Sequence, residues 1–196
     1  MDTYKDIAQL FTDKNVVSAK FLEENGITRN LISKYLYDNV LEKAGYGKYC
    51  LKDSLADEFY LIQIRSQKIV FSHASALYLL KMSDKIPISY DVTVPQGYNV
   101  TKIKRDFSNI NFHYSKVEMW SLGLETATTP FGYKINVYDK ERSVLDIIKN
   151  RKNIDTQIYI QAIKEYFKGK VNLRKLLKYS KQMNLEQKIR EYIEIM

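Results

Sequence analysis

Apolar residues recur at helical spacing in three segments of the first fifty residues. The first segment, residues 3–14, carries its apolar side chains on one side, at Ile7, Ala8, Leu10 and Phe11. This is the pattern of an amphipathic helix. The second segment begins after Ser18, whose hydroxyl can cap a helix N-terminus. It stops at Gly26, because glycine readily takes the left-handed conformation that follows a helix. We therefore expect two short helices here.

The third helical segment, residues 29–44, follows the second after only three residues, and Thr28 is placed to cap it. Two helices joined by so tight a glycine turn indicate a helix-turn-helix. Its apolar residues form an inward stripe at Leu31, Ile32, Tyr35 and Leu36. The outward side chains are then Arg29, Asn30, Ser33, Lys34 and Tyr37. A recognition helix presents its N-terminal residues to DNA bases. Arginine and asparagine read guanine and adenine, and lysine and serine mostly hold phosphates. The alternative is an ordinary solvated helix face.

The stretch EKAGYGKYCL, residues 42–51, predicts a hairpin directly after this helix. Gly45 is expected to end the helix, and Gly47 can take the positive φ of a tight turn. The stretch lacks the spacing of a phosphate-binding loop. Cys50 has no histidine near it in the sequence, so a partly buried strand cysteine is favoured over a reactive thiol. Lys48 is then a candidate phosphate contact in the wing of a winged helix.

Beyond residue 52 the pattern changes to a longer mixed region. Residues 58–84 predict two helices, the second capped near Ser72, and residues 86–95 alternate at the period of a half-buried strand. Further strands are expected at residues 109–115, 117–122, 124–129 and 133–139. From residue 143 the pattern is helical to the end of the chain. The predicted fold class is α+β, with a winged helix-turn-helix domain at 1–52 and a larger mixed α/β domain at 53–196. In that second domain the strands lie mainly at 86–138 and a helical bundle at 143–196.

The net charge of +8 is unevenly distributed over the 196 residues. Residues 1–52 carry +1, residues 53–98 carry −1 and residues 99–196 carry +8. A basic surplus attracts phosphate backbones or acidic partners. A basic face that is merely solvated is the alternative. The single cysteine suits a reducing compartment, and no apolar run approaches the length of a membrane span. We therefore expect a cytoplasmic protein that has no membrane association.

The titratable residues contain no recognisable enzyme signature. His73 and His113 are the only histidines and lie forty residues apart, so each is expected to be structural. Asp139, Glu141 and Asp146 could bind a divalent cation as in nucleases, but the basic residues between them favour ion pairs or helix capping. The chain is therefore expected to be no enzyme and to need no cofactor or metal.

The arrangement resembles the AbiEi family, the antitoxins of type IV toxin–antitoxin systems in bacterial abortive infection and phage resistance. The resemblance covers essentially the whole chain. Its most specific motifs are SHASALYLL at residues 72–80 and YDKERSVLDII at residues 138–148. It implies an N-terminal winged helix that binds inverted repeats in its own promoter and represses the operon. It also implies a C-terminal domain that counters AbiEii, a nucleotidyltransferase-like toxin, without a stable toxin complex.

Carried over to this sequence, the DNA-binding role falls on Arg29, Asn30, Ser33, Lys34, Tyr37 and Lys48. The family offers no short motif for the antitoxic surface. Charge alone suggests Lys149, Arg151, Lys152, Lys164, Lys168, Arg174, Lys175 and Lys178. Because residues 1–52 carry so little charge, either two copies are expected on DNA or the basic C-terminal half is expected to contribute to binding. The alternative functions are a metal-dependent enzyme acting on nucleic acid through Asp139, Glu141 and Asp146, and a non-catalytic RNA-binding accessory protein.

Overall fold

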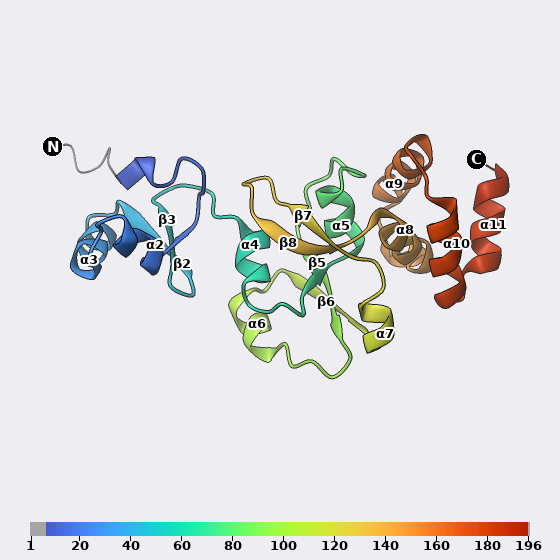
Figure 1. The fold of residues 1–196 in the computed structure, drawn as a ribbon, viewed down its shortest axis with the longest axis horizontal. Coiled ribbons are helices and arrows are strands. Elements are labelled where there is room, and N and C mark those ends of the chain that lie inside the picture. The colour runs from blue at the N-terminus through green and yellow to red at the C-terminus, as the bar shows by residue number, and fades with distance from the viewer. Residues whose placement is uncertain (1–6, 196) are drawn as a thin grey trace. The chain divides into compact units, whose positions relative to one another are not determined.

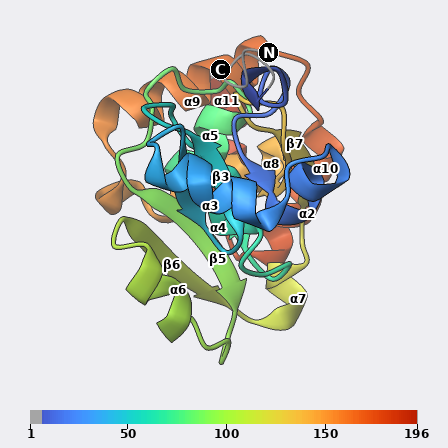
Figure 2. The same ribbon diagram turned by 90° about the vertical axis from the view of Figure 1, so that its left-hand side faces the viewer.

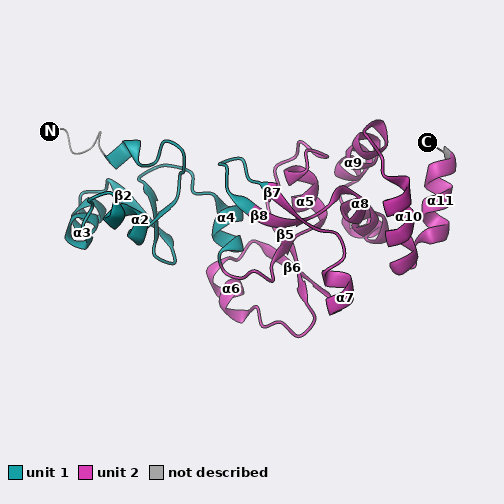
Figure 3. Ribbon diagram, viewed as in Figure 1, with its two compact units in different colours: residues 1–64, 128–134 teal, residues 65–127, 135–196 magenta. Residues whose placement is uncertain are grey.

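The computed structural model describes residues 7–195 and shows an α+β protein (Figure 1). The α+β class expected from the sequence is therefore confirmed. The chain divides into two compact units, which Figure 3 colours separately. Unit 1 comprises Met1–Ile64 and Thr128–Lys134, and unit 2 comprises Arg65–Ala127 and Ile135–Met196.

Unit 1 is built from short helices and a small sheet. Its elements are β1 (Val17–Ser18), α2 (Ala19–Glu24), α3 (Arg29–Tyr37), β2 (Leu41–Gly45), β3 (Lys48–Leu51) and α4 (Glu58–Gln63). The strands form an antiparallel sheet in the order β1-β3-β2. The core contains Ile7, Phe11, Val17, Leu22, Ile32, Tyr35 and Leu41. Of the first predicted helix, residues 3–6 lie outside the described part of the chain, and residues 7–9 are helical.

The ends of α2 and the start of α3 follow the predicted capping. Ser18 Oγ accepts a hydrogen bond from Phe21 N at 3.1 Å, which satisfies a free amide at the start of α2. After α2, Gly26 has a φ of +83°, and Ile27 N donates to Leu22 O at 2.9 Å. This bond closes a Schellman turn. Thr28 Oγ1 caps α3 as expected.

The predicted helix over residues 29–44 is wrong in its second half. The helix ends at Tyr37 because Asn39 takes a φ of +54°, and Val40 N donates to Tyr35 O at 2.9 Å. This is a second Schellman closure, and asparagine is the non-glycine residue best suited to it. The residues that follow form β2, with Leu41 buried in the core.

The hairpin between β2 and β3 is confirmed, but Gly45 does not have the structural role that was expected. Gly45 does not end the helix; it is the last residue of β2. The two-residue loop is Tyr46 and Gly47, with φ values of +53° and +64°. Two consecutive positive φ values are typical of a type I′ hairpin turn. Cys50 lies in β3 as predicted, but it is fully buried and not partly so, and burial raises the pKa of its thiol.

Unit 2 contains a five-stranded mixed sheet in the order β6-β5-β4-β8-β7. Only its residues Thr128, at the end of β7, and Lys134, at the start of β8, are assigned to unit 1. The strands are β4 (Val70–Phe71), β5 (Tyr90–Pro95), β6 (Ile110–Ser115), β7 (Leu124–Thr128) and β8 (Lys134–Tyr138). β4 pairs antiparallel with β5 and parallel with β8. β5 pairs parallel with β6, and the two strands lie side by side in Figure 2.

Helices surround this sheet and form a bundle near the C-terminus (Figure 1). They are α5 (His73–Leu79), α6 (Thr101–Asp106), α7 (Val117–Trp120), α8 (Lys140–Lys149), α9 (Thr156–Lys168), α10 (Leu173–Gln182) and α11 (Glu186–Ile195), with a 3₁₀ turn at Arg151–Asn153. α8 is buried from Glu141 to Ile148 and packs against α5, α9 and α10. The predicted C-terminal helices are confirmed.

Three sequence expectations for unit 2 need correction. The strand expected from residue 86 begins at Tyr90, because Ile86 and Ile88 are exposed and flank a proline. The strand expected at residues 117–122 is absent, and Val117–Trp120 forms the helical turn α7. The expected helical stretch at 58–84 also contains the two-residue strand β4, which is too short to leave a periodic pattern.

Candidate functional site

The exposed side of α3 collects five of the six residues predicted to bind DNA. Arg29, Asn30, Ser33, Lys34 and Tyr37 are all exposed, Tyr37 to 87%. Their spacing places them on adjacent rows of one helix face. The opposite face buries Ile32 and Tyr35 in the unit 1 core. The sequence pattern therefore identified the orientation of α3 correctly.

Three of the six predicted residues already have side-chain partners within unit 1. Ser33 Oγ donates to Arg29 O at 3.0 Å within α3, and the other two, Arg29 and Lys48, contact neighbouring helices. Arg29 Nε lies 2.6 Å from Glu23 Oε1 of α2, although the arginine side chain is 83% exposed. Lys48 Nζ donates to Tyr60 Oη at 3.0 Å and lies 5.4 Å from the centre of that ring. The Tyr60 ring is stacked on Tyr133 at 4.0 Å. Lys48 is thus held by α4, while Arg29 remains on the surface.

The three carboxylates in α8 and at its N-cap have structural partners. Asp139 caps α8 by accepting from Arg142 N at 2.8 Å, and its Oδ2 lies 2.9 Å from Lys175 Nζ. Glu141 Oε2 lies 3.2 Å from the same Lys175. Asp146 pairs with Arg142 at 3.0 Å. The expected ion pairs and capping are therefore confirmed.

Lys175 belongs to this cluster, although charge alone assigns it to the antitoxic surface. Burial tends to lower the pKa of Lys175, but hydrogen bonds and the negative charges of Asp139 and Glu141 outweigh burial and raise it. Of the other residues predicted for that surface, Arg151 stacks over the Tyr159 ring at 4.3 Å. The remaining six are exposed: Lys149, Lys152, Lys164, Lys168, Arg174 and Lys178.

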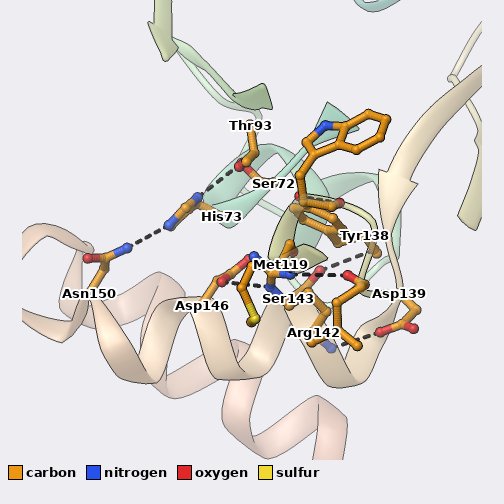
Figure 4. A network of polar contacts seen from close by, with 12 residues as sticks. Ser72, His73, Thr93, Met119, Tyr138, Asp139, Arg142, Ser143, Asp146 and Asn150 are labelled. Carbon is orange, nitrogen blue, oxygen red and sulfur yellow. Dashed lines mark hydrogen bonds and ion pairs between the residues drawn. The ribbon is translucent and has the colours of Figure 1, made fainter. Parts of the chain in front are cut away.

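Arg142 is the centre of a buried polar network in unit 2 (Figure 4). Its side chain is only 5% exposed. Beyond the ion pair with Asp146, its Nη1 donates to the carbonyls of Met119 and, at 3.1 Å, Leu122. The guanidinium lies 4.3 Å from the Tyr138 ring centre. A single arginine therefore joins α8, the segment around α7 and the end of β8.

A second polar group surrounds His73, at the turn between β4 and α5. The His73 ring stacks on His113 at 3.8 Å, so the fold brings together the two histidines that lie forty residues apart in sequence. Asn150 Nδ2 donates to His73 Nε2 at 2.7 Å, and His73 Nδ1 then donates to Ser72 Oγ at 3.0 Å. His113 Nε2 lies 2.9 Å from Asp91 Oδ1.

His73 is held neutral in a strained conformation. Its φ of +47° is unusual for a residue with a side chain and costs free energy that the surrounding packing must supply. Burial lowers its pKa and outweighs the negative charges of Asp146 and Asp91, which raise it, while His113 and Arg142 lower it further. The sequence contained no signal for this histidine stack, because the contact depends on the pairing of β4, β5 and β6.

These two polar groups meet at a cleft of about 870 Å³ in unit 2. Its floor contains His73, Arg142 and Asp146, and its rim contains Lys116 and Lys149. The described residues contain no group of three or more histidine, cysteine or acidic side chains placed to hold a metal ion. Over the same part of the chain, no helix has the length and apolar character needed to cross a membrane.

Comparison with known proteins identifies a related fold but no family. No family model and no curated protein matches the chain. Among solved structures, it is similar to the crystal structure of the Rv2827c protein from Mycobacterium tuberculosis, with a TM-score of 0.60 and 12% sequence identity. The match covers 91% of this chain and 70% of that one. At this identity the likeness supports a shared fold only.

Proposed function

We propose that the chain is a DNA-binding autorepressor with a winged helix-turn-helix in unit 1, in which α3 is the recognition helix and the β2–β3 hairpin is the wing. The observation that carries the proposal is the exposed polar face of α3. Four residues separate the end of α2 at Glu24 from the start of α3 at Arg29, and the β2–β3 hairpin follows α3. A recognition helix needs this order of elements and an outward row of hydrogen-bonding side chains.

The side chains on α3 divide by the contacts that their chemistry allows. Arg29 and Asn30 lie in the first turn and can form paired hydrogen bonds with base edges. Ser33 and Lys34 lie one turn later and suit phosphate oxygens. Lys48 in the wing suits a phosphate too, and its bond to Tyr60 orients it before DNA arrives. Tyr37 adds an exposed ring at the end of the helix.

The second half of the proposal is that unit 2 acts as the antitoxin of a type IV toxin–antitoxin operon. It rests on the AbiEi-like motifs at 72–80 and 138–148 and on the exposed basic side chains of α9 and α10. The partner would be an AbiEii-like nucleotidyltransferase toxin, countered without a stable complex. Lys175 is left out of the proposed surface because it neutralises Asp139 and Glu141.

A mobility-shift titration on the upstream promoter tests the DNA-binding half. We expect the full chain to bind the promoter repeats better than a scrambled sequence of equal length. Arg29→Ala and Asn30→Ala should each reduce this preference by about 1–3 kcal/mol, because each removes a pair of hydrogen bonds to a base. Lys102→Ala, an exposed lysine on α6, is the control and should bind as the wild type does. Equal affinity for both DNA sequences would contradict the proposal.

A rescue assay tests the antitoxin half separately. Cells that express the neighbouring toxin gene are supplied with the wild-type chain or with the triple variant Lys164→Glu, Lys168→Glu and Lys178→Glu. We expect the variant to keep promoter binding and to lose rescue. A double reversal, Lys102→Glu and Lys104→Glu on α6, is the control and should keep both promoter binding and rescue. Full rescue by the triple variant would show that this surface is not the antitoxic one.

A further inference from the structure

The cleft in unit 2 is large enough for a small-molecule ligand and has no part in the proposed DNA contacts. It lies between the ends of β5 and β6, the C-terminal part of α8, and the turn between α10 and α11. Its volume of about 870 Å³ lies in the range of protein ligand sites, roughly 300–1,000 Å³. All of its lining residues belong to unit 2.

The floor of the cleft contains a carboxylate with a hydrogen-bond partner on only one of its two oxygens. The Asp146 side chain is 7% exposed, and its Oδ1 is held by Arg142. Its Oδ2 is buried and has no hydrogen-bond partner among the residues that the structure describes. A buried polar atom left unpaired costs about 1–3 kcal/mol, and native proteins rarely leave one without a reason. A carboxylate oxygen only accepts hydrogen bonds, so its natural partner is an N–H or O–H group of a ligand.

The rim of the cleft is suited to an anion. Lys116 and Lys149 are both exposed, and neither makes an ion pair within residues 7–195. Including Arg142, the lining has three basic side chains and a single acidic one, Asp146. Lysines that are free to move over an open cleft are typical phosphate ligands.

The remaining polar lining can recognise a heterocyclic base. Gln96, Gln182 and Asn184 line the cleft with carboxamide groups. Each carboxamide offers both donors and an acceptor, which match the mixed donor and acceptor edges of nucleobases. A ligand for this cleft therefore needs a hydrogen-bond donor that reaches the Asp146 carboxylate on the floor. It also needs a heterocycle with donor and acceptor groups for the carboxamides, and a negative charge for the two lysines on the rim.

We propose that the cleft binds a nucleoside phosphate, with an amino or hydroxyl group of the nucleoside donating to Asp146 Oδ2 and the phosphate held by Lys116 and Lys149. Two sources can supply this chemistry, namely a free nucleotide and the terminal nucleotide of an RNA strand. The inference does not rest on DNA binding by unit 1, and it holds or fails whether or not the antitoxin role is correct.

Isothermal titration calorimetry on the full chain tests the proposal. The probes are ATP, GTP, CTP and UTP, a single-stranded RNA decamer, and inorganic triphosphate as the phosphate-only probe. We expect at least one nucleotide or the RNA to bind. The double variant Lys116→Glu, Lys149→Glu should weaken this binding at least tenfold, equivalent to about 1.4 kcal/mol. Lys102→Glu has the same type of charge change outside the cleft and should bind as the wild type does.

Asp146→Asn tests the nucleoside contact. Asparagine can still face Arg142 through its oxygen, but then presents an amide donor where the ligand also donates. We expect nucleotide binding to fall at least tenfold and binding of inorganic triphosphate to stay unchanged. The exposed lysine variants provide the test if this buried substitution impairs folding.

The outcomes separate the two sources and decide the proposal. Binding of mononucleotides supports a free nucleotide, and binding of the RNA alone, abolished in the lysine double variant, supports a strand terminus. Inorganic triphosphate that binds as tightly as the best nucleotide overturns the nucleoside assignment. An equal weakening in Lys102→Glu would indicate general attraction to a basic chain and overturn the site. The absence of binding by every probe at millimolar concentration overturns it as well.

Discussion

Replacement of Arg142 by methionine should destabilise unit 2 strongly, because it breaks a buried ion pair on one side only. Methionine fills much of the space of the arginine stem, so cavity formation contributes little. The variant leaves Asp146 as a buried charge without its cation, and the carbonyls of Met119 and Leu122 lose their donor. Removing one partner of a buried pair costs about 3–5 kcal/mol.

This destabilisation is large enough to measure by thermal unfolding. For a unit of this size, a decrease of 3–5 kcal/mol in unfolding free energy lowers Tm by roughly 10–20 °C. Circular dichroism at 222 nm against temperature, together with urea titration, gives both quantities. The matched control is Arg190→Met on α11, because Arg190 also pairs with an acid four residues away, Glu186, but its side chain is 61% exposed. Exposed pairs contribute little, so the control should unfold at the wild-type temperature.

A double variant separates the charge from the packing. Arg142→Met combined with Asp146→Leu removes both charges, and apolar replacement of a whole buried pair is often neutral. We expect the double variant to be more stable than Arg142→Met alone. A destabilisation below about 1 kcal/mol in the single variant would refute the reasoning, since it falls in the range of exposed pairs. So would a double variant that is less stable than the single one.

Three further predictions concern backbone strain, pH and capping. Gly123→Ala should cost about 2–4 kcal/mol, because the added Cβ would lie 2.7 Å from Arg142 Cβ at a φ of +80°. Gly132→Ala, at φ +88° with open space around it, should cost only about 1–2 kcal/mol in the same urea titration. Burial lowers the pKa of His73 in the folded state, so its stabilising contribution is present above the ordinary histidine pKa and is lost as pH falls below about 6.5. His73→Asn, which tolerates positive φ, should therefore lose less stability than the wild type between pH 7.5 and 5.5. Ser18→Ala removes the cap of α2 and should cost about 1 kcal/mol by urea unfolding.

The parts of the fold that the sequence predicted are those determined by nearby residues. The cap at Ser18, the turn at Gly26 and the outward face of α3 each depend on contacts within about five positions of the chain. The same holds for the C-terminal helices, because their apolar stripes are long enough to be recognised as helical in the sequence. The end of α3 was missed because leucine and valine continue a helical stripe through residue 41, whereas Asn39 reverses the chain by adopting a positive φ.

The candidate site in unit 2 could not be predicted in the same way, because its members meet only through the sheet. His73 follows β4 and His113 lies in β6, and β5 stands between these strands. Neither histidine has a sequence neighbour that indicates the other. For Asp146 the basic residues between the three carboxylates did indicate ion pairs, but the burial of its pair with Arg142 depends on α5, α9 and α10 covering α8. The local pattern thus predicted ion pairing, and only packing determines what the unpaired oxygen can do.

The charge of unit 1 constrains the DNA binding that we propose for it. Residues 1–52 carry a net charge of only +1, and the basic candidates for DNA contact are Arg29, Lys34 and Lys48. Each neutralised phosphate contributes about −0.9 to the slope of log K against log salt concentration. One copy that neutralises phosphates through Lys34 and Lys48 gives a slope of about −1.8, and two copies on an inverted repeat give about −3.6. Arg29, which is assigned to a base edge, adds nothing to this slope, and its contact with Glu23 at 2.6 Å competes with the base contact. The proposed promoter binding therefore calls for two copies or for added contacts from the basic C-terminal half, and the salt slope measured at the repeat distinguishes one copy from two.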